Sequence, residues 1–391
     1  MLENNTYRRN TESWGTGSLT SSDEREAVQE ASRNATRRAA APDVWGALQD
    51  ADRNKPQRMT ASNTRVTAGS RNDAQGLHEK AARAVTQVNH IILGKEAEVR
   101  EAMLVFLAGG HILLEDIPGV GKTTMALAFS RTLKLDYNRV QFTPDLMPSD
   151  LTGFSIYSRE AERFIYQQGS VFCNLLLADE INRTSPKTQS ALLEVMEERQ
   201  VTIDGETRAV PSPFFVIATQ NPSGSIGTQP LPEAQVDRFM VHLSMGYPDF
   251  ESELMIARGT GVRERIEGCS AVMTSEEVLK AQRSVREIYV RDDLYRYILE
   301  LITATRNHGM IARGASPRAT IALTEMAKAA AWLNGRNFVL PDDISDQFAY
   351  VVAHRLTLGT SARFEKVNKE QVIQDILKNV RKPAAWTNNA Y

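Results

Sequence analysis

Two features are scarce in this chain of 391 residues: cysteines and long apolar runs. The two cysteines, Cys173 and Cys269, lie far apart and outside any metal-ligand spacing, so we expect small buried thiols of a reducing cytosol rather than a disulfide. The most apolar stretch, residues 103–114, contains two glycines and a histidine and is well short of the ~20 residues that span a bilayer. The first residues, MLENNTYRRNTESWG, lack the apolar core of a signal peptide. We therefore expect a soluble, cytoplasmic protein without a membrane segment.

Net charge is also small. The chain has 46 basic and 48 acidic residues, a net charge of −2 at pH 7. The sequence therefore predicts no global field for nucleic acid, although a local basic groove could lie within that sum. A hydrophobic fraction of 42% and a charged fraction of 24% are typical of soluble globular proteins. At roughly 150 residues per domain, the length predicts two or three domains.

Residues 1–78 differ in composition from the rest of the chain. They are rich in Ser, Thr, Asn, Arg and Ala and poor in large aliphatic residues. Such a segment buries too little apolar surface to offset its ordering entropy, so we expect a polar, disordered extension. Residues 21–40 could form a transient helix capped by Ser22, which leaves docking to a partner as the alternative.

Short apolar segments alternate with helical patterns over residues 79–247. Helices are expected at 78–90, 95–108 and 123–135, and strands at 111–114, 139–142, 174–178, 214–219 and 239–244. The runs at 174–178 and 214–219 are continuously apolar, which is typical of parallel strands buried on both faces. This alternation predicts an α/β domain with a doubly wound parallel sheet.

No further strands are expected beyond Gly246. Residues 248–270 are interpreted as a linker, and residues 271–391 as a smaller all-α domain. Ser275, Ser316 and the sequence Pro-Asp-Asp at 341–343 supply helix-start signals. The predicted helices of this C-terminal half span residues 251–262, 274–290, 292–306, 317–334, 341–356 and 369–380.

A glycine-rich segment, PGVGKTT, joins the first strand to its helix. Its backbone N–H groups and the helix N-terminus suit phosphate oxygens. Lys122 would reach the β- and γ-phosphates of ATP, and the Thr123 hydroxyl would bind Mg²⁺. The generic phosphate-loop pattern has glycine where this chain has Asp116, so a glycine-rich turn with an exposed lysine stays open as an alternative. The predicted nucleotide-binding residues of this loop are Pro118, Gly119, Val120, Gly121, Lys122, Thr123 and Thr124.

Polar residues follow two of the predicted strands. Asp179 and Glu180 end the apolar run LLLA, at the sheet edge where α/β proteins bind ligands. Asp179 would hold Mg²⁺ through water, and Glu180 would polarise the attacking water. Asn221 follows the strand at 214–219 and would sense the γ-phosphate. The alternatives are solvated acids at a strand end and an Asn-Pro turn, the second of which is compatible with the sensing role.

Two arginines extend the candidate site. Arg238 lies at a helix–strand junction, where it could form a surface ion pair or reach the nucleotide of a neighbouring subunit; residue type alone leaves this open. Arg318 projects from the start of a helix capped by Ser316. A cation is unfavourable at this positive helix end unless an anion lies opposite, which predicts a phosphate contact from the helical domain.

Five ordered stretches resemble the MoxR family of AAA+ ATPases over residues 91–377: LLEDIPGVGKTTMA, LLLADEINRTSPKTQSALLEVMEERQVTIDG, FFVIATQNP, LPEAQVDRFM and GASPRA. Asp116 matches what this family often carries. The resemblance implies a hexameric ring with ATP between subunits, and a chaperone-like remodeller that often works with von Willebrand factor A domain proteins. It also implies roles for individual residues: Walker A for Lys122 and Thr123, Walker B for Asp179 and Glu180, sensor 1 for Asn221, a trans-acting finger for Arg238, sensor 2 for Arg318, the adenine-flanking segment for Ile92, Leu93 and Gly94, and a place near the subunit boundary for Arg183.

Two segments are interpreted as hairpin inserts. Residues 199–210 alternate around Asp204 and Gly205, a pair that favours a type I′ turn. Residues 151–168 carry aromatic and aliphatic residues at roughly alternating positions. In a ring of this family both hairpins would face the central pore; alternatively, the aromatics pack the hairpin onto its own domain.

Two other functions share the phosphate-loop chemistry. A nucleic-acid motor or loader is the alternative to a protein remodeller, but the sequence has no basic stripe or recognisable nucleic-acid module. A small-molecule phosphotransferase is disfavoured because Arg238, Arg318 and a long helical domain suit a ring better than a monomeric kinase.

Overall fold

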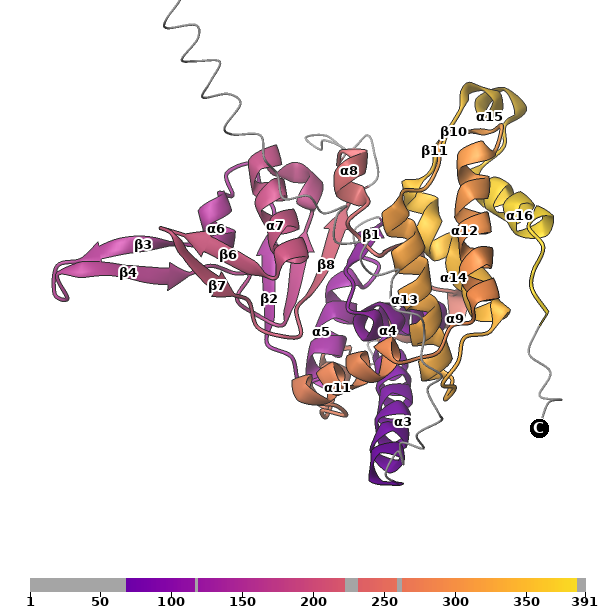
Figure 1. Ribbon diagram of the computed structural model, residues 1–391. Helices are drawn as coiled ribbons and strands as arrows, with labels where there is room; N and C mark the ends of the chain where they lie inside the picture. Colours follow the sequence, from indigo (N-terminus) through magenta and orange to yellow (C-terminus); the bar gives the residue numbers. More distant parts are fainter. Residues whose placement is uncertain (1–67, 117–118, 222–230, 259–261, 385–391) are drawn as a thin grey trace, which may run out of the picture. The chain divides into compact units, whose positions relative to one another are not determined.

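The computed structural model describes residues 68–116, 119–221, 231–258 and 262–384 (Figure 1). Residues 1–67 of the extension predicted to be disordered (1–78), the Ser22 helix and Pro118 of the phosphate loop lie outside these described residues, whereas residues 68–78 of that extension are helical, which corrects the prediction. None of the described helices is long and apolar enough to cross a membrane.

A sheet of five parallel strands forms the centre of the α/β domain, in the order β2-β5-β8-β1-β9. The inner strands β5 and β8 are the continuous apolar runs of the sequence and are buried except at their last residues. The edge strand β2, with the sequence YNRVQ, is half-exposed. This confirms the predicted doubly wound sheet. The strand bounds are Ile112–Glu115 for β1, Tyr137–Gln141 for β2, Leu175–Asp179 for β5, Phe215–Gln220 for β8 and Val241–Leu243 for β9.

Alternate residues of these strands enter two separate cores. Ile112, Leu177 and Ile217 face a large core with the helices α3 (Ala68–Ile91), α4 (Glu96–Ala108) and α5 (Lys122–Thr132), whereas Leu113 and Leu176 face the helix α7 (Pro186–Glu198). This strand alternation is what a sheet covered on both faces requires.

The helix α3 begins earlier than predicted, at Ala68 rather than at residue 78. Residues 68–76 have no apolar periodicity, so their sequence contained no helix signal. The second half of α3 buries Ala81, Ala84 and Val88 in the large core, and a helix packed there can extend through polar turns.

Two hairpins leave the sheet domain side by side (Figure 1). One pairs β3 (Gly153–Ser158) with β4 (Arg163–Gln168) after the short helix α6 (Pro148–Thr152), and the other pairs β6 (Gln200–Ile203) with β7 (Glu206–Ala209). Asp204 and Gly205 have φ values of 54° and 78°, as a type I′ turn requires. The predicted hairpins are therefore confirmed. The Arg208 guanidinium stacks on the Tyr166 ring at 4.0 Å and joins them.

The C-terminal part is helical, with one correction. Two short strands, β10 (Ile311–Arg313) and β11 (Thr357–Leu358), form an antiparallel sheet in a domain predicted to be all-α. Strands this short carry no alternation for a sequence pattern to reveal. The helices and turns beyond β8 are α8 (Glu233–Val236), α9 (Phe250–Ala257), α10 (Val262–Glu267), α11 (Ser275–Arg286), α12 (Asp292–Asn307), α13 (Pro317–Leu333), α14 (Pro341–Val352), the 3₁₀ turn η3 (Ala353–Arg355), α15 (Thr360–Glu365) and α16 (Lys369–Asn379).

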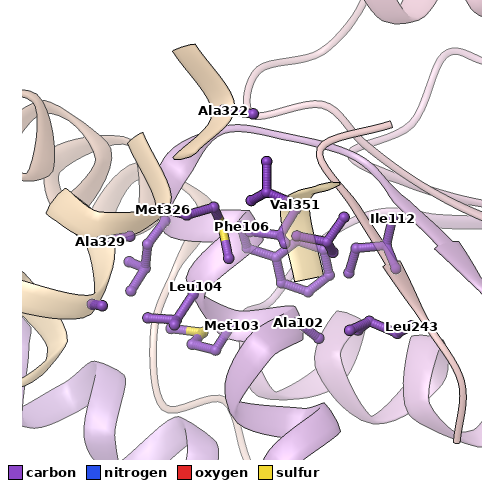
Figure 2. Close-up of a cluster of buried hydrophobic side chains, with 14 of the residues drawn as sticks. Ala102, Met103, Leu104, Phe106, Ile112, Leu243, Ala322, Met326, Ala329 and Val351 are labelled. Atoms are coloured by element: carbon purple, nitrogen blue, oxygen red, sulfur yellow. The ribbon is translucent and has the colours of Figure 1, made fainter. Parts of the chain in front are cut away.

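The large core continues from the sheet domain into this helical domain. Figure 2 shows Phe106 of α4 between Ile112 of β1 and Met326 of α13. The Phe106 ring also contacts Phe129 and Phe215, at centroid distances of 5.0 and 4.6 Å. Since α13 presents small alanines, α4 can approach its backbone closely. The two domains therefore share one apolar interior.

Candidate nucleotide-binding site

The phosphate loop connects the carboxyl end of β1 to the first turn of α5. Gly119 and Gly121 have φ values of 91° and 98°, a region that favours glycine, and Lys122 begins the helix. The loop opens onto a cavity of about 240 Å³. This cavity brings together predicted residues from three strand ends: Gly119, Gly121, Lys122, Thr123, Thr124, Asp179, Glu180 and Asn221.

Lys122 is buried at the base of this cavity. Its Nζ donates to the backbone oxygen of Asp116 at 2.7 Å. Burial lowers the pKa of Lys122, while the charges of Asp116, Asp179 and Glu180 act in the opposite direction. The ammonium group is thus held among three acids and is bonded to the backbone at the end of β1.

The contacts of Asp116 explain why this chain has an aspartate where the generic pattern has glycine. Its carboxylate accepts hydrogen bonds from the Ser244 hydroxyl at 3.0 Å, from the Gly246 N–H at 3.2 Å and from the Met245 N–H. These contacts tie the end of β1 to the segment that follows β9. A glycine at this position would remove the acceptor of all three donors, of which the Met245 N–H is buried. Sequence reasoning identified Asp116 but not this role.

Asp179 ends β5, and both of its carboxylate oxygens are occupied. Oδ1 accepts from the Thr219 hydroxyl at 2.6 Å, and Oδ2 accepts from Nη2 of the half-exposed Arg139 at 2.7 Å. Thr219 in turn accepts from the backbone N–H of Glu180 at 2.9 Å. The buried threonine therefore fixes the backbone that carries both acids.

Glu180 follows in a left-handed conformation, with φ of 57°. Asn221 Nδ2 donates to Oε1 at 3.1 Å, while Gln141 Nε2 and Arg183 Nη1 each donate to Oε2 at 2.8 Å. The Arg183 hydrogen bond is the main cause of a lowered Glu180 pKa. A non-glycine residue with positive φ at a candidate site is a typical place for backbone strain. Glu180 is thus an ionised carboxylate held at both oxygens.

Sequence reasoning missed Arg139, Gln141 and Thr219. Arg139 and Gln141 can be found only once β2 is known to pair with β5, which places Gln141 beside Asp179 in register, and Thr219 only once β8 is known to pair with β5. Family resemblance placed Arg183 near the subunit boundary, and the structure shows its guanidinium paired with the Glu180 carboxylate.

The residues present fit Mg²⁺. No group of three or more His, Cys, Asp or Glu residues that could hold a metal occurs in the described part of the chain. Mg²⁺ bound with a nucleotide takes only one or two protein groups and completes its shell with phosphates and water. The Thr123 hydroxyl and the Asp179 carboxylate line the same cavity and supply such oxygens.

Ile92, Leu93 and Gly94 link α3 to α4, outside the phosphate cavity. Ile92 is buried in the large core. Gly94 has φ of 66°, and a Cβ on it would lie 2.6 Å from side-chain oxygens of Asp249 and Ser252. Glycine is therefore required for the close approach of this link to the start of α9. Contact with adenine stays a prediction.

Arg238 and Arg318 lie together, away from the phosphate cavity. Arg238 Nε is 3.4 Å from Glu197 Oε2, and Arg318 forms an ion pair with Oε1 of the same residue. Both guanidinium groups line a cavity of about 400 Å³ between α7 and α13. Within this chain the anion that faces Arg318 is the Glu197 carboxylate, and the predicted phosphate contact stays a prediction. The structure does not bring either arginine to the described phosphate-loop residues of its own chain.

Two family models match the chain. Residues 111–241 match the model described as the ATPase family associated with various cellular activities (AAA), and residues 303–376 match the AAA lid domain. The first match covers the sheet up to the start of β9, the phosphate loop and Arg238. The second covers Arg318 and most of the helical domain.

Individual relatives match over most of the chain. YeaC of Bacillus subtilis (strain 168) is 45% identical, over 79% of this chain and 97% of its own length. The chaperone MoxR1 of Mycobacterium tuberculosis (strain H37Rv) is 40% identical, over 77% of this chain and 82% of its own. A crystal structure from Cytophaga hutchinsonii superposes with a TM-score of 0.75 at 38% identity, covering 81% of this chain and 98% of its own.

Proposed function

Because the chain belongs to the MoxR family of AAA+ ATPases, we propose that it binds ATP with Mg²⁺ in the phosphate-loop cavity, hydrolyses it between subunits of a ring, and thereby remodels protein partners. One observation carries the proposal. The cavity gathers Lys122, Thr123, Asp179, Glu180 and Asn221, whereas the two arginines expected to complete it face elsewhere on the chain.

The residues of the cavity supply one half of the proposed site, the groups that bind the phosphates and activate the water. The loop N–H groups and Lys122 bind the phosphates, and bound Mg²⁺ would neutralise charge on them. Glu180 accepts a proton from the attacking water, and Asn221, already hydrogen-bonded to Glu180, orients it. Because Glu180 also bonds Gln141 and Arg183, these contacts must loosen before it can bind water.

The other half comes from a neighbouring subunit. Arg238 and Arg318 share one carboxylate, so a phosphate within reach of one is within reach of both. We place both at the neighbour's ATP, with Glu197 holding them until the phosphate replaces it. A trans-acting arginine is worth roughly 10³–10⁵ in rate in related phosphoryl-transfer systems. Sensor 2 then acts across the interface rather than on its own chain's nucleotide.

Membership of the family supports a proposal for the assembly and its partners. We propose a hexameric ring in the cytoplasm, working with a von Willebrand factor A domain protein on a protein client. The chaperone among the relatives supports a protein client rather than nucleic acid. The β3–β4 hairpin exposes Phe154, Ile156 and Phe164, which suits client contact. Residues 79–247, 248–270 and 271–391 remain our proposed domain, linker and lid limits.

Two variants test this proposal. Glu180→Gln should keep its affinity for a fluorescent ATP analogue and lose phosphate release, because the base is gone and the phosphate loop is intact. Lys122→Ala should lose the affinity itself. Full hydrolysis by Glu180→Gln, or unchanged affinity in Lys122→Ala, would overturn the assignment. Glu180→Gln with ATP would also trap clients from native lysate for identification.

A further inference from the structure

A buried arginine of the helical domain contacts the segment that carries Arg238. Arg355 ends η3, and its side chain is only 3% exposed. Nε donates to Asp237 Oδ1 at 2.8 Å, Nη2 to the Phe239 carbonyl at 2.7 Å and Nη1 to the Met240 carbonyl at 3.1 Å. All three nitrogens of the guanidinium thus hold residues 237–240. Asp237 immediately precedes Arg238.

Asp237 also connects to the second interface arginine. The Ser316 hydroxyl donates to both Asp237 carboxylate oxygens, at 3.0 and 2.8 Å. Ser316 is the N-cap of α13, and Arg318 lies in the first turn of that helix. One carboxylate therefore joins the backbone next to Arg238 to the helix start that bears Arg318.

The lid holds the other end of α8 as well. Glu233, at the first turn of α8, accepts a hydrogen bond from Thr357 at 2.6 Å and pairs with Arg313. Both partners belong to the β10–β11 sheet. The short helix that precedes Arg238 is thus fixed to the lid at both ends.

From these contacts we infer that Arg355 is a positioning residue: through Asp237 and Ser316 it holds Arg238 and Arg318 as one rigid pair that reaches the neighbour's ATP together. This inference rests on the proposed function. The Arg355 guanidinium is always charged and holds its N–H donors in a fixed plane. Only one arrangement of the cluster therefore satisfies all of its hydrogen bonds. Removing Asp237 would leave the buried Arg355 without its counter-charge, and removing Arg355 would free the partly exposed Asp237 to move. Lid movement in one subunit would then act on catalysis in the next.

Arg355→Gln tests the inference. The variant should bind a fluorescent ATP analogue as the wild type does, because the phosphate cavity is untouched. Its kcat should fall roughly 10²-fold, the effect expected for about 1 Å of misplacement in a catalytic group. Mixed with Glu180→Gln subunits, it should regain activity, since its intact Glu180 is then served by the neighbour's correctly placed arginines. A variant that merely unfolds would regain nothing.

Arg336→Gln is the matched control. Arg336 forms a two-pronged pair with Asp343 inside the lid, at 2.7 and 2.6 Å, and does not belong to the Arg355 cluster. It should lower the melting temperature and leave kcat unchanged. If Arg355→Gln does not fold, Ser316→Ala removes the second link to Asp237 and should show a smaller loss of kcat with the same recovery in mixtures.

The outcomes separate the inference from the proposed function. An unchanged kcat in a folded Arg355→Gln, or a loss without recovery in mixtures where Arg238→Ala does recover, would overturn the role of Arg355. If Arg238→Ala itself never recovers with Glu180→Gln in assembled rings, trans catalysis fails instead. Mass photometry of each mixture establishes that rings are present.

Discussion

A buried acid at the junction of the two domains should make the stability of this protein depend on pH near neutrality. Glu101 of α4 is 5% exposed and accepts a hydrogen bond from Gln347 Nε2 of α14 at 3.1 Å. Among the described residues, Glu101 Oε2 and Gln347 Oε1 have no partner. A proton on Oε2 would let Glu101 donate to Gln347 and satisfy both atoms. The neutral acid is therefore the form that fits.

The pKa of Glu101 gives the size of this pH-dependent change in stability. Burial raises the pKa of Glu101 from 4.5 to about 7; Asp346 adds to this, while the Gln347 hydrogen bond and Arg100 oppose it. Because the folded-state pKa is the higher one, the stability that Glu101 contributes is complete below pH 4.5 and is lost as the pH rises through 7. At ~1.4 kcal/mol per pKa unit the loss is about 3 kcal/mol.

Glu101→Gln should remove this loss, since the amide imitates the protonated acid. Urea unfolding should give similar stabilities for variant and wild type near pH 4.5, with the variant about 3 kcal/mol more stable at pH 8. Glu98→Gln, on the same helix but partly exposed, is the control and should show no comparable gain. A Glu101→Gln variant no more stable than wild type at pH 8 would refute the neutral-acid interpretation.

Two further predictions concern the phosphate cavity. Asp116→Gly restores the generic motif but removes the acceptor of the Met245 and Gly246 N–H groups. We expect the free energy of unfolding to fall by about 2 kcal/mol and ATP binding to weaken, as measured by thermal unfolding and by titration with an ATP analogue. An unaltered melting temperature would contradict this. Arg139→Ala frees Asp179 from a competing cation; half-saturating Mg²⁺ for nucleotide binding should fall about two- to fivefold, as a half-exposed ion pair allows, and a rise would show that Arg139 instead aligns Asp179 for the metal.

Local sequence signals were sufficient for the elements that form the phosphate cavity. A few neighbouring residues determine the conformation of each of three features: the glycine-rich phosphate loop, the apolar strand that ends in Asp179 and the Asp204–Gly205 turn. Strand-to-helix alternation then places the ends of parallel strands at one edge, which is why Asn221 and Glu180 were predicted to lie close together.

Contacts that depend on strand order or on the lid could not be predicted in this way. Arg139 reaches Asp179 because β2 lies beside β5, and nothing in either strand specifies that neighbour. Arg355 meets Asp237 across 118 positions of sequence, between a 3₁₀ turn and a short helix that carry no distinctive pattern. The β10–β11 sheet likewise pairs segments that are far apart in the sequence and too short to carry a strand pattern.

The proposed catalytic site has two halves, the phosphate-binding residues and the arginines, and different parts of the fold hold them in place. The phosphate half is built on strand ends within the sheet, so a movement of the lid leaves Lys122 and Glu180 in place. The arginine half is attached to the lid through Arg355 and Ser316. A change in lid position would therefore move the arginines, whereas Asp116 at the end of β1 is bonded to the segment after β9 rather than to the lid. Under the proposed ring, in which the arginines of one subunit reach the nucleotide of the next, a change in lid position would act on the neighbouring site in one direction around the ring.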